Sequence, residues 1–169
     1  MVVRGAASIE APAWSPSGAR IAFARQLKAT NWELYAIAAS GRRLRRLTRD
    51  AAQETTPAWS PDGRRIAYAR QLVGGNWAIE VMSADGTGRR RVTSRRVSAV
   101  EPTWSPDGRR IAFTSQPRPD LSAIAVVNAA GGRARRLTDD ALFATQPDWS
   151  PRGGLIAFAA RELIGEPEA

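Results

Sequence analysis

One phrase of seven residues recurs four times along this chain at a constant interval of 45 residues. Each copy has the form Pro-x-Trp-Ser-Pro-x-Gly, and its tryptophan and glycine are structural markers of the repeat. The eight markers are Trp14, Gly18, Trp59, Gly63, Trp104, Gly108, Trp149 and Gly153. A period of about 40 to 50 residues that carries several short strands is typical of the blades of a β-propeller. The repeat therefore predicts an all-β fold.

Each period contains four strand-like segments separated by turn residues. In the second copy, the segments are residues 57–60, 65–70, 79–82 and 90–93. The Pro-Asp-Gly turn between the first two favours a hairpin, since proline presets φ and glycine accepts a positive φ. We place the repeat proline at the start of the first strand, because it cannot donate a hydrogen bond to a ladder. Four such strands predict one antiparallel propeller blade.

The number of repeats predicts a single domain, residues 1–169, with about 3.75 blades. The repeats span approximately residues 11–48, 56–93, 101–138 and 146–160, and residues 1–3 match the fourth strand of a preceding blade. The sequence thus indicates a partial propeller, with two interpretations left open. Either the chain is a fragment of a longer propeller, or self-association of two chains completes one ring, because exposed strand edges favour association.

Alternation along the second strand predicts how neighbouring blades pack. Ile21 and Phe23 face one side of the blade, whereas Ala22 and Ala24 face the other. A face of large side chains against a face of small ones fills space between adjacent sheets without voids. We expect the four repeat tryptophans to lie in the core.

The repeat resembles that of TolB-like β-propellers, which are relatives of the WD-like repeats. The resemblance rests on Pro-x-Trp-Ser-Pro-Asp-Gly-Arg-Arg-Ile-Ala-Phe, then Ala-Asp-Gly and Arg-Arg-Leu-Thr, and extends from Ile9 to about Ala160. It implies a non-catalytic module for protein–protein interaction or scaffolding, with a protein partner of unknown identity. The family also includes propellers that gate prolyl-oligopeptidase-like enzymes, so a recognition or gating segment of such an enzyme is the alternative.

Residues for catalysis and metal binding are scarce. The chain has no histidine and no cysteine, which excludes a Ser-His-Asp triad, a histidine base and thiolate metal sites. Asp62 and Asp107 share one turn position, but Ser17 and Arg152 occupy it in the other copies. The pattern therefore favours turn formation over metal binding. We predict no enzymatic activity, no metal and no cofactor.

The net charge of +9 raises the question of anionic partners. Lys28 is the single lysine, and the bias to arginine and alanine is typical of GC-rich coding, so nucleic acid is not the expected partner. Polyanion binding through an arginine-rich perimeter remains a second alternative. No apolar stretch reaches membrane-spanning length, which argues against membrane insertion. The start lacks the apolar core of a secretion signal, so the sequence reads as cytoplasmic, although TolB itself is periplasmic.

The loops between the second and third strands of successive blades share one rim. In two repeats these loops carry arginine, glutamine and tryptophan, which are favoured at recognition surfaces. The candidate binding residues are Arg25, Gln26, Trp32, Arg70, Gln71 and Trp77. Ser122 stands where the third repeat would have its tryptophan. The alternative is a structural role, in which Trp32 and Trp77 cap the hydrophobic edges of their own blades.

Overall fold

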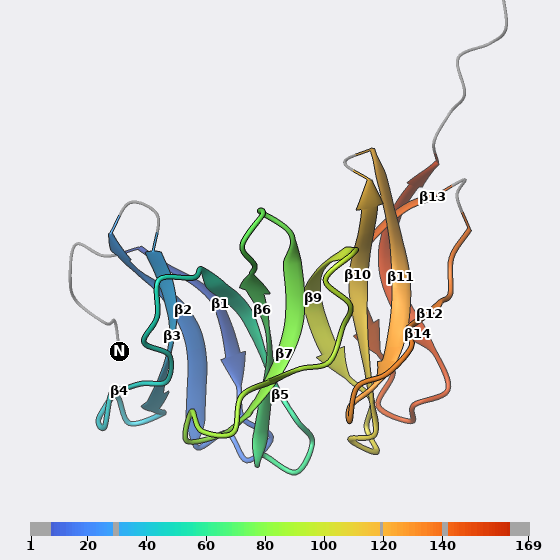
Figure 1. Ribbon diagram of the computed structural model, residues 1–169. Helices are drawn as coiled ribbons and strands as arrows, with labels where there is room; N and C mark the ends of the chain where they lie inside the picture. Colours follow the sequence, from blue (N-terminus) through green and yellow to red (C-terminus); the bar gives the residue numbers. More distant parts are fainter. Residues whose placement is uncertain (1–7, 29–30, 119, 140–141, 163–169) are drawn as a thin grey trace, which may run out of the picture.

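The computed structural model describes residues 8–28, 31–118, 120–139 and 142–162, and all the regular structure in this part of the chain is β-strand. Three four-stranded antiparallel sheets and one two-stranded sheet follow one another along the chain (Figure 1). We call these sheets blades A to D. The result confirms the predicted all-β architecture of four-stranded antiparallel blades. Among the described residues, no helix is present that could cross a membrane.

The blades have the following strands. Blade A contains β1 (Ile9–Trp14), β2 (Arg20–Lys28), β3 (Asn31–Ala38) and β4 (Arg45–Arg46). Blade B contains β5 (Glu54–Trp59), β6 (Arg65–Gln71), β7 (Trp77–Ser83) and β8 (Arg90–Arg91). Blade C contains β9 (Ser98–Trp104), β10 (Arg110–Arg118), β11 (Leu121–Asn128) and β12 (Arg135–Arg136), and blade D contains β13 (Leu142–Trp149) and β14 (Ile156–Glu162).

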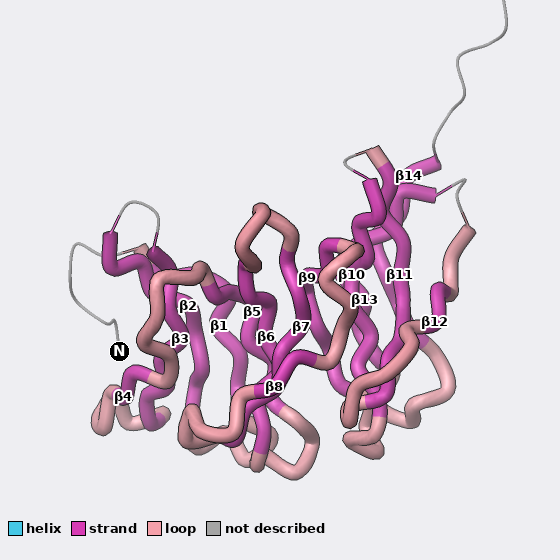
Figure 2. Tube along the Cα trace, in the orientation of Figure 1, coloured by secondary structure: helices cyan, strands magenta, loops and turns pink. Residues whose placement is uncertain are grey.

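The blades stand side by side as a fan, in chain order (Figure 1). The first strands of successive blades (β1, β5, β9 and β13) contact one another along its inner side. Strands β2, β6 and β10 end at one edge of the fan, which we call the upper rim (Figure 2). The Pro-x-Gly turns occupy the opposite edge, the lower rim. The topology therefore places corresponding residues of each repeat next to one another around the fan.

Each first strand contains a β-bulge at the repeat proline. The residue before that proline has a positive φ, between 48° and 55°, in every blade. These residues are Ala11, Thr56, Glu101 and Gln146. The pairing register with the second strand shifts at the same place. The predicted strand start was therefore wrong, because the strand begins before the proline. The bulge interrupts the hydrogen-bond ladder at the proline, so the missing N–H of that residue costs no ladder bond.

Side-chain hydrogen bonds hold the Pro-Asp-Gly turns. In blade B, the Ser60 hydroxyl accepts from Arg65 N at 2.9 Å and lies 2.5 Å from the Asp62 carboxylate, to which it donates. Asp62 also accepts from Arg64 N at 3.0 Å, and the hydrogen bond from Ser60 lowers the pKa of this aspartate. Asp107 makes the corresponding contacts in blade C. Both aspartates thus stabilise turns.

A threonine lies two residues after the fourth strand of each complete blade. The Thr48 hydroxyl accepts from Leu34 N at 2.8 Å, and Thr93 and Thr138 accept from the corresponding amides of β7 and β11. The threonine side chain replaces a backbone acceptor of the ladder. Strands β4, β8 and β12 therefore contain two residues each, fewer than the four expected from the sequence.

The predicted packing of large against small faces is confirmed. At junction A/B, Ala22 and Ala24 of blade A pack against Ile66 and Tyr68 of blade B, and all four side chains are fully buried. At junction B/C, the same positions are Ala67 and Ala69 against Ile111 and Phe113.

The four repeat tryptophans differ in burial. Trp59 and Trp104 are buried between blades, as expected, but Trp14 is 60% exposed. Trp14 lies on the large face of blade A, and no described blade lies against that face. The expectation of a core position was therefore wrong for Trp14. The fourth strand expected at residues 1–3 lies outside the described residues.

We predict that Phe113→Ala lowers the free energy of unfolding by about 3–5 kcal/mol, because this ring is 2% exposed and its removal leaves a cavity. Phe158→Ala is the matched control, since the same repeat position is 40% exposed in blade D. Urea denaturation measures both. Similar losses in the two variants would contradict the packing described for junction B/C.

Candidate functional site

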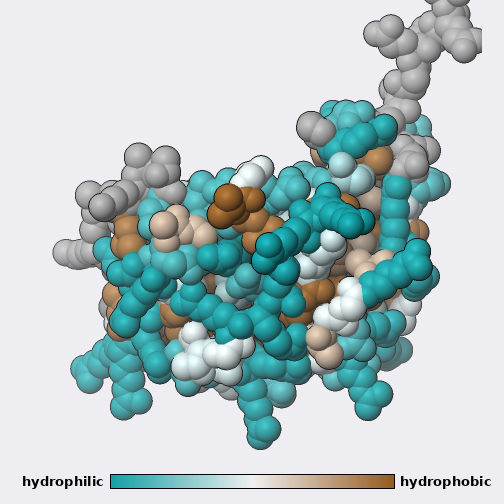
Figure 3. All heavy atoms as spheres, in the orientation of Figure 1, coloured by the Kyte–Doolittle hydropathy of each residue, from teal (hydrophilic) through white to brown (hydrophobic). Residues whose placement is uncertain are grey.

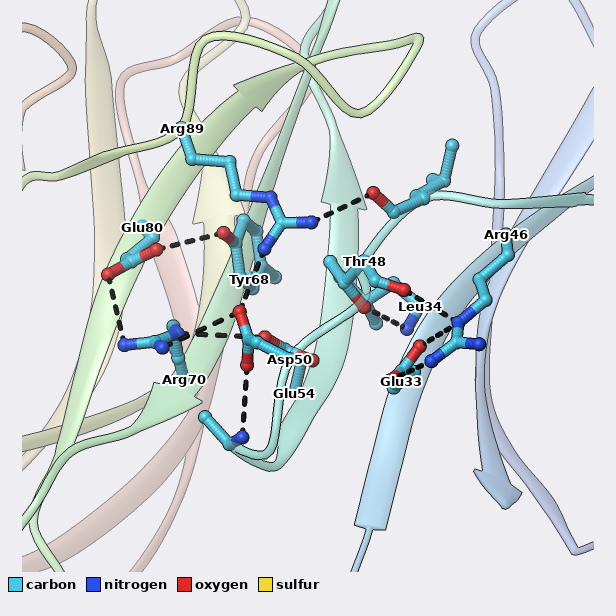
Figure 4. A network of polar contacts seen from close by, with 12 residues as sticks. Glu33, Leu34, Arg46, Thr48, Asp50, Glu54, Tyr68, Arg70, Glu80 and Arg89 are labelled. Atoms are coloured by element: carbon cyan, nitrogen blue, oxygen red, sulfur yellow. Dashed lines mark hydrogen bonds and ion pairs between the residues drawn. The ribbon is translucent and has the colours of Figure 1, made fainter.

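Arg70 lies in a polar network at junction A/B (Figure 4). Its guanidinium is 3.5 Å from Asp50, 3.6 Å from Glu54 and 3.9 Å from Glu80. Asp50 follows blade A along the chain, whereas Glu54 and Glu80 belong to strands β5 and β7. Arg70, a residue predicted to bind at the rim, therefore holds carboxylates at the junction.

Further contacts extend this network on both sides. The Tyr68 hydroxyl donates to Glu80 at 2.9 Å, and Arg89 donates to Asp50 at 2.9 Å and to the carbonyl oxygen of Leu47 at 3.1 Å (Figure 4). Blades A and C have Phe23 and Phe113 in place of this tyrosine. The network is thus a departure from the repeat at one junction.

Glu54 is the most deeply buried acid of the network. Its side chain is 0% exposed, and its nearest cation, Arg70 Nε, is at 3.6 Å, beyond an ordinary hydrogen-bond length. Burial, followed by the negative charge of Asp50, raises the pKa of Glu54 to about 8. This carboxyl group is therefore mostly protonated at neutral pH.

The other predicted rim residues divide into two groups. Arg25 stacks over the Tyr35 ring at 5.5 Å, on the large face of blade A. Gln26 and Gln71 face Trp32 and Trp77 in the strand register, and Gln71 accepts from Gln53 Nε2 at 3.0 Å. Arg25 is thus held within blade A and Arg70 at junction A/B, whereas the two glutamines lie beside the tryptophans.

Trp32 and Trp77, from adjacent blades, line one small cavity at the upper rim. We call it the rim slot; its lining residues are Glu10, Trp32, Gln53, Thr55 and Trp77. Its volume is about 170 Å³. Both tryptophans are half-buried and also pack against the hydrophobic clusters of junctions A/B and B/C. Each indole ring therefore supports its junction and forms a wall of the slot.

Three residues of the rim slot were not anticipated from the sequence. Glu10 and Thr55 occupy the same repeat position in strands β1 and β5, and Gln53 directly precedes β5. They are distant in sequence from both tryptophans, so only the neighbourhood of first strands in the fan brings them together. The signal available in the sequence was that Glu10 and Thr55 stand where the third repeat has the apolar Val100.

A larger cavity of about 500 Å³ lies between blades C and D. Its apolar walls include Val126 and Leu137 of blade C and Phe158 of blade D. At junctions A/B and B/C, third-strand side chains such as Met82 and Val127 belong to the hydrophobic clusters. Blade D has two described strands, so we interpret this cavity as the position of a third strand rather than as a ligand site.

The outer surface of the fan is rich in arginine. The face drawn in Figure 3 is largely hydrophilic over the region of β4, β8 and β12, each of which is an Arg-Arg pair. Arg46 also pairs with the buried Glu33 and donates to the carbonyl oxygen of Thr48 at 2.9 Å. Within the described ranges, no group of three or more Asp and Glu side chains is arranged to hold a metal ion.

Comparison with known proteins identifies relatives of this fold. The family model of the TolB beta propeller domain matches residues 1–76 and 70–165. A search of the curated proteins found no match. Among solved structures, "putative TolB from Agrobacterium tumefaciens" has a TM-score of 0.79 and 26% identity, over 91% of this chain and 55% of that one. TolB from Acinetobacter baumannii has a TM-score of 0.72 and 26% identity, over 86% of this chain and 36% of that one.

A third similar structure is the β-propeller domain of the Trilobed protease from Pyrococcus furiosus. It has a TM-score of 0.63 and 16% identity, over 95% of this chain and 51% of that one. At this identity the likeness shows the fold alone. The present chain spans about half the length of the Agrobacterium protein and about a third of the Acinetobacter protein.

We predict that Glu54→Gln reduces the loss of stability at alkaline pH. The folded state keeps the Glu54 proton up to a pKa of about 8, whereas the unfolded chain releases it near the ordinary value of 4.5. The unfolded state therefore binds fewer protons between these values, and stability falls as the pH rises through them. Glutamine has nearly the same shape as glutamic acid, but its amide group does not titrate.

Thermal melting between about pH 5 and pH 9 measures this effect. The fall in melting temperature is expected to be smaller in Glu54→Gln than in the unsubstituted chain. Asp120→Asn is the control, because this carboxylate is 75% exposed. Parallel pH profiles for all three proteins would show that Glu54 does not titrate as described.

Proposed function

The chain belongs to the TolB β-propeller domain family, and from this membership and the rim slot we propose that it is a non-catalytic recognition module that binds a protein partner at its upper rim. The observation that carries the proposal is the meeting of Trp32 and Trp77 in one cavity. They occupy the same position in two successive repeats, and they come from different blades. Tryptophan contributes more binding energy at protein interfaces than most residue types.

The chemistry of the chain supports a role without catalysis. It contains no histidine or cysteine, so the commonest general base and the thiolate nucleophile are missing from the sequence. The repeat serines Ser60 and Ser105 are fully buried, and their hydroxyl groups hold turns. These serines are not placed to attack a substrate.

A recognition domain attached to a peptidase is the second candidate. The observation that favours it is the same fold in the propeller domain of a protease. A peptidase domain with its own nucleophile, encoded in frame with this chain, would support this second function over that of a separate scaffold.

Selection of peptides from a random phage-displayed library tests the proposed function. We expect the chain to enrich peptides whose binding falls at least tenfold when Trp32→Leu and Trp77→Leu are combined, because leucine keeps apolar packing but removes the large indole surface. The control is the pair Arg64→Ala and Arg109→Ala, two exposed residues on the lower rim. Fluorescence anisotropy measures the affinities.

The outcomes separate binding at the upper rim from other modes. Peptides that bind the Trp32→Leu/Trp77→Leu variant as tightly as the unsubstituted chain would contradict recognition through the rim slot. Loss of binding in the lower-rim variant alone would place recognition at the Pro-x-Gly turns. Thermal melting of both double variants shows that each remains folded.

A further inference from the structure

The rim slot combines two indole rings with one carboxylate and two neutral polar groups. At about 170 Å³, it is smaller than the cavities of roughly 300–1,000 Å³ that bind whole small molecules. A cavity of this size accommodates one side chain of a partner. The chemistry of its walls then decides which kind of side chain it prefers.

Glu10 supplies the only formal charge among the lining residues. Its side chain is exposed, and its carboxylate makes no hydrogen bond or ion pair with the other described residues. The chain carries a net charge of +9, and this acid is nevertheless left without an arginine partner in the described part. An unpaired carboxylate beside two indole rings attracts a cation.

Elsewhere in the fan, indole rings already carry cations. Arg20 stacks over Trp59 at 4.6 Å, and the same contact recurs at 4.7 Å between Arg65 and Trp104. Among the described residues, no guanidinium stacks on Trp32 or Trp77, the two tryptophans of the rim slot. Their rings are therefore available for a cation that comes from another molecule.

Arg70 is a described cation of junction A/B, the junction against which Trp32 also packs. In strand β5, Glu54 points to the same side as Arg70, with which it pairs in the register, whereas its neighbours Gln53 and Thr55, which line the slot, point to the other side. Arg70 is also surrounded by Asp50, Glu54 and Glu80, at 3.5 to 3.9 Å. The charge of Arg70 is thus compensated by carboxylates of the network and not by Glu10 of the rim slot.

We infer that the rim slot is a receptor for a cationic side chain, lysine or arginine, of a peptide partner. The cation lies against the Trp32 and Trp77 rings, and Glu10 neutralises its charge. This inference rests on the proposed function, since it names the chemistry that the same slot recognises. It predicts that charge, and not apolar size alone, determines what enters.

A pair of small probes separates these two properties. Choline carries a quaternary ammonium group, and 3,3-dimethylbutan-1-ol has the same shape without the charge. We expect choline to shift the indole N–H resonances of Trp32 and Trp77 in a saturable titration with the ¹⁵N-labelled chain. We expect the neutral isostere to bind about tenfold more weakly, as a cation–π contact with a nearby carboxylate implies. Trp32→Phe and Trp77→Phe assign the two resonances.

Substitution of the carboxylate tests the role of Glu10. Glu10→Gln is expected to weaken choline binding about fivefold and to leave binding of the isostere unchanged. Asp148→Asn is the matched control, because it removes one exposed negative charge from the first strand of a distant blade. It is expected to leave both affinities unchanged.

Equal binding of the two probes, or no shift at concentrations up to roughly 50 mM, would overturn the inference. So would a loss of choline binding that is the same in Glu10→Gln and Asp148→Asn. The peptide selection distinguishes this failure from failure of the proposed function. Peptides that depend on Trp32 and Trp77, but contain no enriched lysine or arginine and ignore Glu10→Gln, would retain the upper rim as a binding surface and remove the cation from it.

Discussion

The contact on which the fan depends is the one between the repeat tryptophan of each blade and the blade before it. The Trp59 indole donates to the carbonyl oxygen of Ala13 at 3.1 Å, and Arg20 of blade A covers its ring. The same arginine donates to the carbonyl oxygen of Gly63, in the turn that follows Trp59, at 3.4 Å. One arginine and one tryptophan therefore set the distance between first strands and between turns at once. The equivalent residues repeat this arrangement at junction B/C.

Much of this arrangement follows from the sequence because it repeats. The period, the alternation of large and small side chains and the glycines of the turns all recur every 45 residues, so each copy supports the interpretation of the others. The bulge residues could not be found in this way. Ala11, Thr56, Glu101 and Gln146 share a positive φ but no side-chain chemistry. Their conformation comes from the strand pairing around the proline, which a single sequence does not display.

The candidate site, too, could be predicted from the sequence only in part. The two tryptophans of the rim were evident from the sequence, because they recur at one position in two repeats and are replaced by Ser122 in the third. The roles of their neighbours were not. Arg70 belongs to the same loop region of the repeat as Trp77, yet its partners Asp50, Glu54 and Glu80 come from three other segments. Each of these contacts depends on strand register and on which blades are adjacent.

One group of departures from the repeat lies at junction A/B. Tyr68 and Glu80 replace apolar residues of blade C, and Glu54 stands where the other first strands have Ile9, Ala99 and Ala144. A propeller needs none of these substitutions to close its blades, because junction B/C packs without them. The buried network and the rim slot share strand β5: Glu54 belongs to the network, and its neighbour Thr55, on the other face of the strand, lines the slot. Carboxylates hold Arg70 in the network, whereas among the described residues no guanidinium stacks on the two indoles or pairs with Glu10. The departures from the repeat at this junction therefore supply Arg70 with carboxylates of its own, next to a slot whose only formal charge is that of Glu10.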